Sequence, residues 1–341
     1  MENKENKILI TGGTGFLGSY IIRTFLKAGY RNIFITKRKE SRLDLIRDEL
    51  DKITVIDTHI NDLMGMEAAM EGVDTVIHAA ALVSFVPEDE SELFKTNVEG
   101  TETIVNVCLT AKIKKLIFVS SVAALGRLKD EKLINEQNKW VPSNLNTQYA
   151  KSKYLAEQHI WRGKEEGLDV AIINPSLVIG PGFWNSGSSN IFKTVYKGLP
   201  FYPPGNTGVV DVRDVAAMIL SIFEKDISGE RIISSGGNIS YQSLFEKIAI
   251  SLGVNPPKRK LSRILGSVAW RIIKIQSWIL GNRPTITQES MRTSFNSFYY
   301  DNTKSVELLG YKYYEIDQTI EASCQSFLNS KKNGLEYGII D

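Results

Sequence analysis

The sequence predicts an α/β fold, a doubly wound parallel sheet with a smaller, mostly helical C-terminal domain. Two observations predict it. From residue 7 to residue 174, short apolar runs typical of strands alternate with stretches that have the periodicity of helices, and this alternation indicates βαβ units. A glycine-rich turn also joins the first strand to the first helix. Because right-handed crossovers connect such strands, ligands are expected at the carboxyl ends of the strands.

The expected elements follow one another regularly. Strands are predicted at residues 7–11, 32–36, 53–56, 75–78, 115–120 and 170–174. Helices are predicted between them at residues 17–28, 42–50, 63–70, 96–111 and 149–165. After Pro175, glycine, proline, serine and aromatic residues fill a loop-rich stretch, and a helix at 212–224 and a strand at 231–234 return to the sheet. The first domain is therefore expected at residues 1–175 plus about 208–235, and a cap at about 176–207 plus 236–341.

Length and composition exclude several classes of protein. The 341 residues, 43% hydrophobic and 23% charged, exceed what a single core usually fills. A formal charge of +2 gives no reason to expect a nucleic-acid partner. Cys108 and Cys324 are too few for a disulfide framework and lack metal-ligand spacing, so we expect reduced thiols and no metal site. With no signal-peptide core and no apolar run approaching ~20 residues, we expect a cytoplasmic protein without a membrane span.

One segment, residues 258–280, has an unusual pattern. Basic and small side chains recur there at helical spacing: Lys260, Arg263, Ser267, Arg271 and Lys274. They leave a broad face of Leu, Ile, Val and Trp, which predicts an amphipathic helix packed on the rest of the protein. A substrate lid and a contact with a membrane surface are the alternatives.

The glycine-rich turn carries the first functional signal. It reads Thr11-Gly12-Gly13-Thr14-Gly15-Phe16-Leu17-Gly18, with glycines three apart at positions 12, 15 and 18. Glycine permits the tight turn and the close approach of backbone N–H groups to a pyrophosphate, whose charge a helix N-terminus favours. Because the turn lies between a strand and a helix, it predicts a Rossmann-type dinucleotide site.

The end of the second strand bears on the choice between NAD and NADP. An acidic residue about 20 residues past the glycines binds the ribose 2′-hydroxyl of NAD, whereas an Arg accommodates the 2′-phosphate of NADP. This chain has Lys37 and Arg38 there, and the first acid is Glu40. We therefore expect NADP, with NAD as the alternative.

Three further residues suggest acid–base chemistry. Tyr149 and Lys153 are four residues apart on a predicted helix, so they share one face. A phenol with a pKa of about 10 is a poor acid or base near neutrality, and a nearby ammonium lowers that pKa. Ser121 follows a predicted strand at the edge where the ligand site is expected, and its hydroxyl can bond a reacting oxygen.

Together these motifs resemble the extended short-chain dehydrogenases/reductases of the NAD-dependent epimerase/dehydratase superfamily, in the branch of dihydroflavonol-4-reductases and 3β-hydroxysteroid dehydrogenases. The matching segments are the glycine loop and residues 74–81, 97–101, 118–121, 149–153, 174–181, 210–216 and 301–311. The resemblance implies that Tyr149 is the acid/base, that Lys153 lowers its pKa and holds the nicotinamide ribose, and that Ser121 polarises the substrate oxygen.

The resemblance also implies a set of cofactor contacts. They are Gly12, Thr14, Gly15, Phe16, Leu17, Gly18, Lys37, Arg38, His59, Ile60, Ala79, Ala80, Ala81, Asn97, Val119, Tyr149, Lys153, Pro175 and Val178. One position departs from the family, whose members usually bind the adenine amino group with an Asp where this chain has His59. Asp57 or Asp62 is the alternative for that contact.

Three functions remain open at this point. The first is an oxidoreductase that transfers hydride between NAD(P) and a small, apolar alcohol or carbonyl compound. The second is a nucleotide-sugar epimerase or dehydratase with tightly bound NAD, and the third is a dinucleotide-binding regulator without catalysis. Enzymes of the second kind commonly carry an Arg where this chain has Thr207, which favours the reductase. Because Tyr149 and Lys153 are both present, the regulator ranks last.

Aromatic residues in the expected substrate loops also suit a flat, apolar substrate. They are Phe85, Trp140, Phe183 and Trp184, with Phe201 and Tyr202 further along. The helices at 96–111 and 149–165 leave a homodimer open, as in relatives. The sequence identifies neither the substrate nor the stereochemistry of the reaction.

Overall fold

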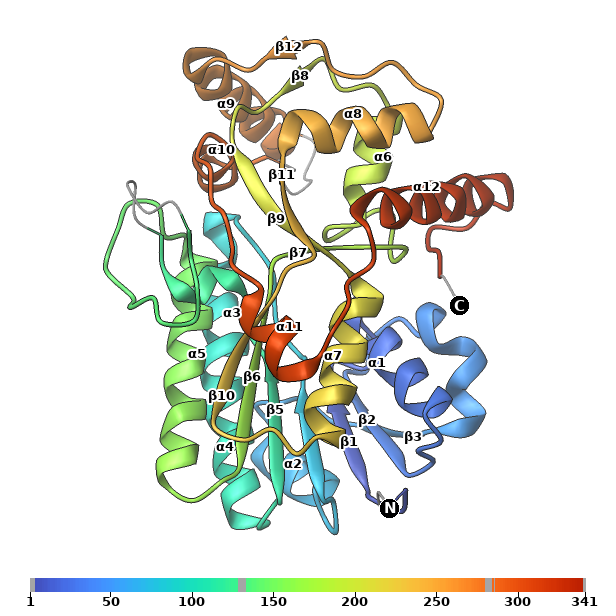
Figure 1. The fold of residues 1–341 in the computed structure, drawn as a ribbon, viewed down its shortest axis with the longest axis vertical. Helices are drawn as coiled ribbons and strands as arrows, with labels where there is room; N and C mark the ends of the chain where they lie inside the picture. The colour runs from blue at the N-terminus through green and yellow to red at the C-terminus, as the bar shows by residue number, and fades with distance from the viewer. Residues whose placement is uncertain (1–3, 128–132, 280–283, 285, 340–341) are drawn as a thin grey trace.

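The central sheet of the computed structural model has seven strands in the order β10-β6-β5-β4-β1-β2-β3, and each neighbouring pair is parallel (Figure 1). The structure describes residues 4–127, 133–279, 284 and 286–339. The strands of the sheet are β1 (Ile8–Thr11), β2 (Ile33–Lys37), β3 (Thr54–Asp57), β4 (Thr75–His78), β5 (Lys115–Val119), β6 (Val170–Pro175) and β10 (Glu230–Ser234). The predicted doubly wound parallel sheet is confirmed.

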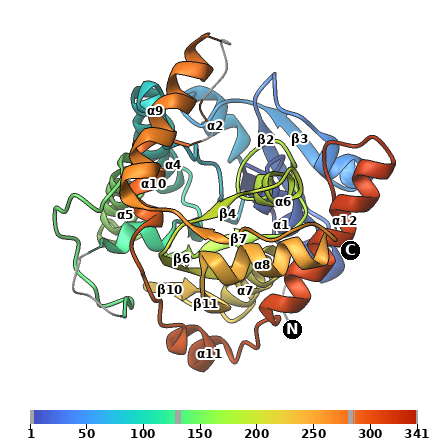
Figure 2. The same cartoon turned by 90° about the horizontal axis from the view of Figure 1, so that it is seen from above.

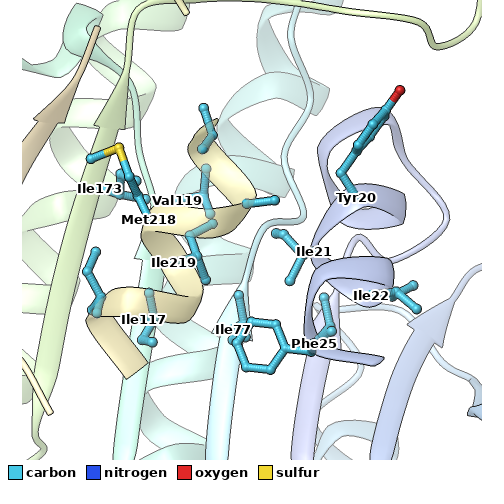
Figure 3. Close-up of a cluster of buried hydrophobic side chains, with 14 of the residues drawn as sticks. Tyr20, Ile21, Ile22, Phe25, Ile77, Ile117, Val119, Ile173, Met218 and Ile219 are labelled. Atoms are coloured by element: carbon cyan, nitrogen blue, oxygen red, sulfur yellow. The ribbon is translucent and has the colours of Figure 1, made fainter. Parts of the chain in front are cut away.

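Helices cover both faces of this sheet. One face carries α1 (Phe16–Lys27), the 3₁₀ helix η1 (Asp44–Lys52) and α7 (Val212–Glu224), and the other carries α2 (Leu63–Ala69), α4 (Gly100–Thr110) and α5 (Gln148–Glu165). Ile8 and Ile10 pack in the first of the two cores and Leu9 in the second, because successive side chains of a strand point to opposite faces. Figure 3 shows the first core between α1, α7 and the strands.

Two predicted helices differ locally from expectation. The segment expected as a helix at 42–50 is the 3₁₀ helix η1, with Leu45 and Ile46 as its buried residues. The helix expected at 96–111 begins as the π-helical turn η3 (Lys95–Glu99) and continues as α4. Short helical segments also lie at η2 (Pro87–Asp89), α3 (Glu90–Phe94) and η4 (Val122–Leu125).

The cap is mostly helical, as expected, and it also contains short strands. A three-stranded sheet is built from β7 (Leu177–Ile179), β9 (Asn206–Asp211) and β11 (Gly237–Ser240), and β8 (Phe201–Tyr202) pairs with β12 (Arg259–Lys260). The helices are α6 (Asn190–Tyr196), α8 (Tyr241–Ser251), α9 (Arg263–Ile279), α10 (Gln288–Ser294) and α12 (Ile316–Lys332). Seen from above, these elements lie over the carboxyl ends of the central strands (Figure 2).

The chain returns to the first domain a second time near its end. Helix α11 (Thr303–Leu309) packs on β10 and α7 rather than on the cap. Leu309 belongs to the core between α1 and α7, and its carbonyl accepts a hydrogen bond from Lys225 Nζ at 2.7 Å. The boundary expected at 236–341 for the cap therefore includes a piece of the first domain.

The amphipathic stretch expected at 258–280 forms α9, although residue 280 lies outside the described part. One side of α9 packs as expected, with Gly266 close to Met291 and Phe295. Its other apolar side is exposed, for example at Ile264 and Ile272, which departs from the expectation of a fully packed helix. None of the helices in the described ranges is both long and apolar enough to cross a membrane.

Candidate active site

In the glycine loop, Gly12 and Gly18 leave no room for a side chain. Gly12 has a φ of +74°, and a Cβ there would lie 2.7 Å from the Ala80 nitrogen. A Cβ on Gly18 would lie 2.1 Å from the Gly12 oxygen, so α1 starts directly against the loop. Gly15 is the N-cap of α1, no side chain caps this end, and the first turn has no acidic residue. The first N–H groups of α1 are therefore available to an anion.

A cavity of about 300 Å³ opens beside this loop. Of the predicted cofactor contacts, those that line it are Gly12, Thr14, Gly15, Phe16, Leu17, Gly18, Lys37, Arg38, His59, Ile60, Ala79, Ala80 and Ala81. The lining also includes residues that the sequence analysis missed: Thr36, Ser41, Thr58, Leu82, Glu92 and Thr96. Segments after β1, β2, β3 and β4 thus meet in one cavity at the carboxyl edge of the sheet.

The side chain of Thr58 bears on whether a nucleotide fits this cavity. Its hydroxyl is buried and has no hydrogen-bond partner within the described ranges, although it lines the cavity. A buried hydroxyl without a partner is costly, so a polar ligand atom at this position would be stabilising. Together with the glycine loop, which a Cβ would fill, Thr58 makes the cavity suitable for a dinucleotide.

The residues around the expected adenine contact are already engaged. The Nδ1 of His59 accepts a hydrogen bond from the Asn61 backbone nitrogen at 3.1 Å. Asp62 caps α2 by accepting from the Gly65 nitrogen at 3.1 Å, and Asp57 pairs with Lys37. Neither Asp57 nor Asp62 lines the cavity, which leaves His59 and Thr58 as the polar side chains at this position.

The two basic residues at the end of β2, Lys37 and Arg38, are both paired with carboxylates. The register of β2 and β3 sets Lys37 opposite Asp57, and the two side chains form an ion pair. Arg38 Nε lies 3.3 Å from Glu40 Oε1, with 57% of the Arg38 side chain exposed. An exposed ion pair of this kind contributes little free energy, so Arg38 remains available to a ligand phosphate.

The predicted Ser, Tyr and Lys come together between β5 and α5. Thr147 caps α5 by accepting from the Ala150 nitrogen at 3.0 Å, and Tyr149 follows in the first turn of the helix. The Tyr149 hydroxyl is hydrogen-bonded to the Ser121 hydroxyl. Lys153 is 3% exposed, and its Nζ donates to the Val119 carbonyl at 2.8 Å. All three side chains therefore lie at the carboxyl end of β5.

Burial dominates the protonation of this group. It raises the pKa of Tyr149 to about 12, although the Ser121 hydrogen bond and the positive charge of Arg127 act in the opposite direction. The expectation of a lowered phenol pKa is therefore not met, because desolvation outweighs both favourable contacts. Burial also lowers the pKa of Lys153 to about 8, opposed by the charge of Glu157. At neutral pH Tyr149 is a neutral O–H donor.

A network of buried polar side chains lies next to Ser121 and Lys153. Glu157 is fully buried, accepts from Asn174 Nδ2 at 2.6 Å and pairs with Arg231 at 3.2 Å. The same Asn174 amide donates to the Ser121 carbonyl at 2.9 Å. The sequence analysis missed Glu157, although its spacing of four from Lys153 and eight from Tyr149 sets all three on one face of α5.

A second network fixes the end of β4. The hydroxyl of Thr101 donates to the Asn97 carbonyl, so it accepts from His78 Nε2 at 3.1 Å. His78 Nδ1 then accepts from the Thr11 hydroxyl at 2.7 Å. Complete burial, together with the charge of Lys153, lowers the pKa of His78 to about 3, so the ring is a neutral bridge between β1 and α4.

The remaining predicted cofactor contacts lie outside the lining of the cavity. Asn97 is buried and clamps Leu82, accepting from its nitrogen at 2.7 Å and donating to its carbonyl at 2.9 Å. Val119 supplies the carbonyl that Lys153 binds. Pro175 ends β6 and Val178 lies in β7, where the chain leaves the first domain for the cap.

The predicted substrate aromatics divide into two groups. Phe85 makes an edge-to-face contact with Tyr149, with ring centroids 5.8 Å apart, and Trp140 stacks on Tyr154 at 4.5 Å. Trp184 is only 3% exposed and packs in the cap core against Phe192 and Phe327. The expected substrate contact of Trp184 is therefore wrong.

The other loop aromatics contact residues other than Tyr149. Phe183 lies under the Arg42 guanidinium, 4.6 Å from ring centroid to Cζ. Phe201 and Tyr202 form β8, which pairs with β12. Phe183 therefore contacts the first domain, whereas Phe201 and Tyr202 pair within the cap.

Arg127 is a residue near Tyr149 that sequence reasoning missed. Its guanidinium lies over the Phe298 ring at 4.7 Å, and its Nε is buried without a hydrogen-bond partner in the described ranges. Its charge lowers the pKa values of both Tyr149 and Tyr241. No sequence motif indicates it, because Arg127 lies just after η4 whereas Phe298 and Tyr241 come from distant parts of the cap.

Comparisons with known proteins agree with this geometry. The model of the NAD dependent epimerase/dehydratase family matches residues 8–234. A putative dihydroflavonol 4-reductase from Synechocystis sp. is 30% identical over 329 residues, which are 94% of each chain.

Solved structures share the whole architecture. The crystal structure of gox2253 has a TM-score of 0.80 at 28% identity and covers 97% of this chain and 99% of its own. DesIV, a dTDP-glucose 4,6-dehydratase from Streptomyces venezuelae solved as a double mutant with NAD and DAU bound, has a TM-score of 0.77 at 20% identity, covering 97% and 99%. The second likeness shows the fold alone. The chain belongs to the NAD-dependent epimerase/dehydratase family, among the extended short-chain dehydrogenases/reductases, and is an enzyme, either an oxidoreductase or an epimerase.

Proposed function

We propose that the enzyme is an NADP-dependent reductase of a small carbonyl compound with a flat, apolar body, working through Ser121, Tyr149 and Lys153. The observation that carries the proposal is the state of Tyr149. Its pKa is raised to about 12 by burial while its hydroxyl is hydrogen-bonded to Ser121. A phenol that stays protonated at neutral pH is suited to donate a proton to a carbonyl oxygen as the alcohol forms.

The dinucleotide would supply or accept the hydride when bound. Ser121 and Tyr149 would both bond the substrate oxygen, Ser121 to orient and polarise it and Tyr149 to give it the proton. One of the three N–H donors of Lys153 is used by Val119, so two remain for the hydroxyls of the nicotinamide ribose. A charged Lys153 would stabilise the phenolate that Tyr149 leaves behind.

The glycine loop and the start of α1 would hold the pyrophosphate, and Arg38 would contact a 2′-phosphate. The lining of the cavity by Arg38 and its weak, exposed pairing with Glu40 support NADP. The carboxylate of Asp57 is occupied by Lys37, so it is less available to a bare ribose hydroxyl.

The substrate class is inferred from the surroundings of Tyr149. Phe85 contacts the Tyr149 ring directly, and Trp140 covers Tyr154 on the next turn of α5. Thr207 in β9 has no charge with which to bind a substrate diphosphate. The relative named a putative dihydroflavonol 4-reductase is consistent with a flat, apolar ketone.

The decisive experiment identifies the nucleotide and follows its redox state. Purified enzyme is denatured, the released nucleotide is identified, and NADPH consumption is measured with a panel of aromatic and cyclic aldehydes and ketones. The reductase predicts NADPH that is consumed in a one-to-one ratio with alcohol product. Tightly held NAD that shows no net change after conversion of a nucleotide sugar would instead establish the epimerase.

Tyr149→Phe provides the matched variant, because it removes one hydroxyl and keeps the ring against Phe85. We expect kcat to fall by about 10²–10⁴-fold while the dissociation constant for NADPH changes little. Turnover that survives in Tyr149→Phe would show that another group supplies the proton.

A further inference from the structure

Helix α9 carries an apolar stripe that no described part of the protein covers. The exposed fractions are 80% for Ile264, 44% for Leu265, 50% for Val268, 57% for Ile272 and 59% for Ile275. At 3.6 residues per turn these five positions fall within an arc of about 100°. The exposed side chains therefore form one continuous face, which isolated surface hydrophobics do not.

The opposite side of α9 is the packed one. Gly266 lies against Met291 and Phe295, and Ala269 and Ile273, on the same side of the helical wheel, are partly buried. The helix is therefore attached to the cap through its inner side, and the exposed stripe is a second apolar surface. In Figures 1 and 2, α9 lies at the outer edge of the cap.

Basic residues predominate around the stripe, and an exception is Glu88, whose carboxylate lies 3.9 Å from Lys274 Nζ. Between Glu246 and Glu289 the sequence contains no Asp or Glu. The basic residues in that interval are Lys247, Lys258, Arg259, Lys260, Arg263, Arg271, Lys274 and Arg283. On the helical wheel Arg263, Arg271 and Lys274 lie along one flank of the stripe, so a planar surface in contact with the stripe also meets these charges.

We propose that α9 docks this enzyme on an anionic lipid surface. An amphipathic helix with large aliphatic side chains on one face and Lys and Arg beside them lies at the boundary of headgroups and acyl chains. The aliphatic stripe enters the acyl boundary, and the basic flank meets lipid phosphates. Each Lys or Arg near such a surface strengthens binding about fivefold, and salt weakens the effect.

A second copy of the chain fits the stripe less well. A two-fold interface centred on α9 would bring the same patch of each copy together. With the two helices antiparallel, the basic flank of one copy would lie against the basic flank of the other, and the exposed Glu88 beside Lys274 would offset this only in part. An anionic bilayer supplies the opposite charge over the whole patch.

A chain of contacts joins α9 to the start of α5. Helix α10, which packs on α9, carries Glu289, and both Glu289 carboxylate oxygens lie 3.3 Å from the Gln148 nitrogen at the start of α5. Tyr149 is the next residue. The lipid contact is thus connected to the candidate active site through α9 and α10.

The test is sedimentation of the full-length enzyme with vesicles of phosphatidylcholine alone and of phosphatidylcholine with phosphatidylglycerol, at low and high salt. We expect the enzyme to bind the anionic vesicles at low salt. Binding should be weaker at high salt and weaker to the neutral vesicles. Ile264→Glu and Ile272→Glu should weaken binding at least tenfold, and Arg271→Gln with Lys274→Gln by about 25-fold at two factors of five. Met64→Glu in α2, also 80% exposed before substitution, is the matched control and should bind as the wild type does.

Unchanged thermal unfolding establishes that each variant is folded. Wild-type enzyme that stays in solution with anionic vesicles at low salt would overturn the proposal, as would Ile264→Glu and Ile272→Glu variants that bind like the wild type. A lipid-free dimer that Ile264→Glu converts to a monomer, measured by analytical ultracentrifugation, would assign the stripe to a second copy instead. Because binding is measured without turnover, these outcomes are independent of the proposed reductase activity.

Discussion

Asn174 Nδ2 donates to the buried Oε1 of Glu157 across 2.6 Å, and this carboxylate is four residues along α5 from Lys153. The negative charge of Glu157 raises the pKa of Lys153, in opposition to burial, which leaves that pKa at about 8. Glu157 is thus the group on the described part of α5 that helps to keep Lys153 charged near neutral pH.

We predict that Glu157→Gln narrows the pH range of activity. In the wild type, kcat/KM for carbonyl reduction should fall as the pH rises through about 8, because the ammonium is lost. Removal of the Glu157 charge lowers the Lys153 pKa, so the fall should begin at a lower pH. Rate profiles at constant ionic strength measure the shift.

The same substitution affects stability. Arg231 loses its carboxylate partner, and we expect unfolding by urea to show a loss of about 1–3 kcal/mol. Asp169→Asn is a useful control because it removes a carboxylate that pairs with Lys115 far from Lys153. An identical pH profile in Glu157→Gln and wild type would show that Glu157 does not influence the protonation of Lys153.

Arg127 should distinguish the two directions of the reaction. Alcohol oxidation needs the Tyr149 phenolate, which the Arg127 charge favours, whereas carbonyl reduction needs the phenol. We expect Arg127→Met to slow oxidation by on the order of tenfold, from about 1–2 kcal/mol of lost charge stabilisation, and to slow reduction less.

Arg127→Lys keeps the charge and should recover most of the oxidation rate. Initial rates in both directions with saturating cofactor make the comparison. Equal losses in both directions, without recovery in Arg127→Lys, would mean that Arg127 acts by packing on Phe298 rather than by charge.

Two glycines allow the cost of backbone strain to be distinguished from the cost of a steric clash. Gly12 and Gly29 both have positive φ, +74° and +97°, but a Cβ on Gly29 would meet nothing within 4 Å. We expect Gly29→Ala to cost about 1–2 kcal/mol from backbone strain alone. Gly12→Ala should cost more and should abolish nucleotide binding, because its Cβ collides with the backbone of Ala80.

Urea unfolding with and without NADP distinguishes the two variants. The nucleotide should stabilise the wild type and Gly29→Ala but not Gly12→Ala, because a ligand stabilises only the folded state that binds it. Stabilisation of Gly12→Ala by NADP to the wild-type extent would place the pyrophosphate away from this loop.

Arg38 and Lys37 should differ in their effect on nucleotide choice. Arg38→Gln removes a charge-assisted contact and should weaken NADP binding by about 10–100-fold with little change for NAD. Lys37→Gln should have a smaller effect, since Lys37 is engaged by Asp57. Calorimetric titration of both nucleotides gives the ratio, and parallel losses for NAD and NADP in Arg38→Gln would argue against a 2′-phosphate contact.

The sequence predicted the fold well because local patterns determine most of it. The central strands are short and apolar on both faces, and the turn that requires Gly12 and Gly18 lies within one short stretch of sequence. Tyr149 and Lys153 were found for a similar reason, since their spacing on one helix is itself a spatial relationship.

The features that were missed depend on tertiary register. Lys37 and Asp57 are opposite each other only because β3 pairs with β2 in one particular alignment. Trp184 lies in a loop-like sequence, yet α12, more than a hundred residues later, brings Phe327 against it. Arg127 and Phe298 likewise meet through the folding of the cap onto the first domain.

The packing of α11 has a consequence for how the chain is made. Leu309 belongs to the core whose other members include Ile8 and Ile10, so this core is complete only after α11 has been synthesised. Until then the edge strand β10 lacks one of the helices that pack on it. A nascent chain that has not yet reached residue 303 therefore exposes apolar surface of the first domain, which makes the synthesis of the cap a stage at which a chaperone is useful.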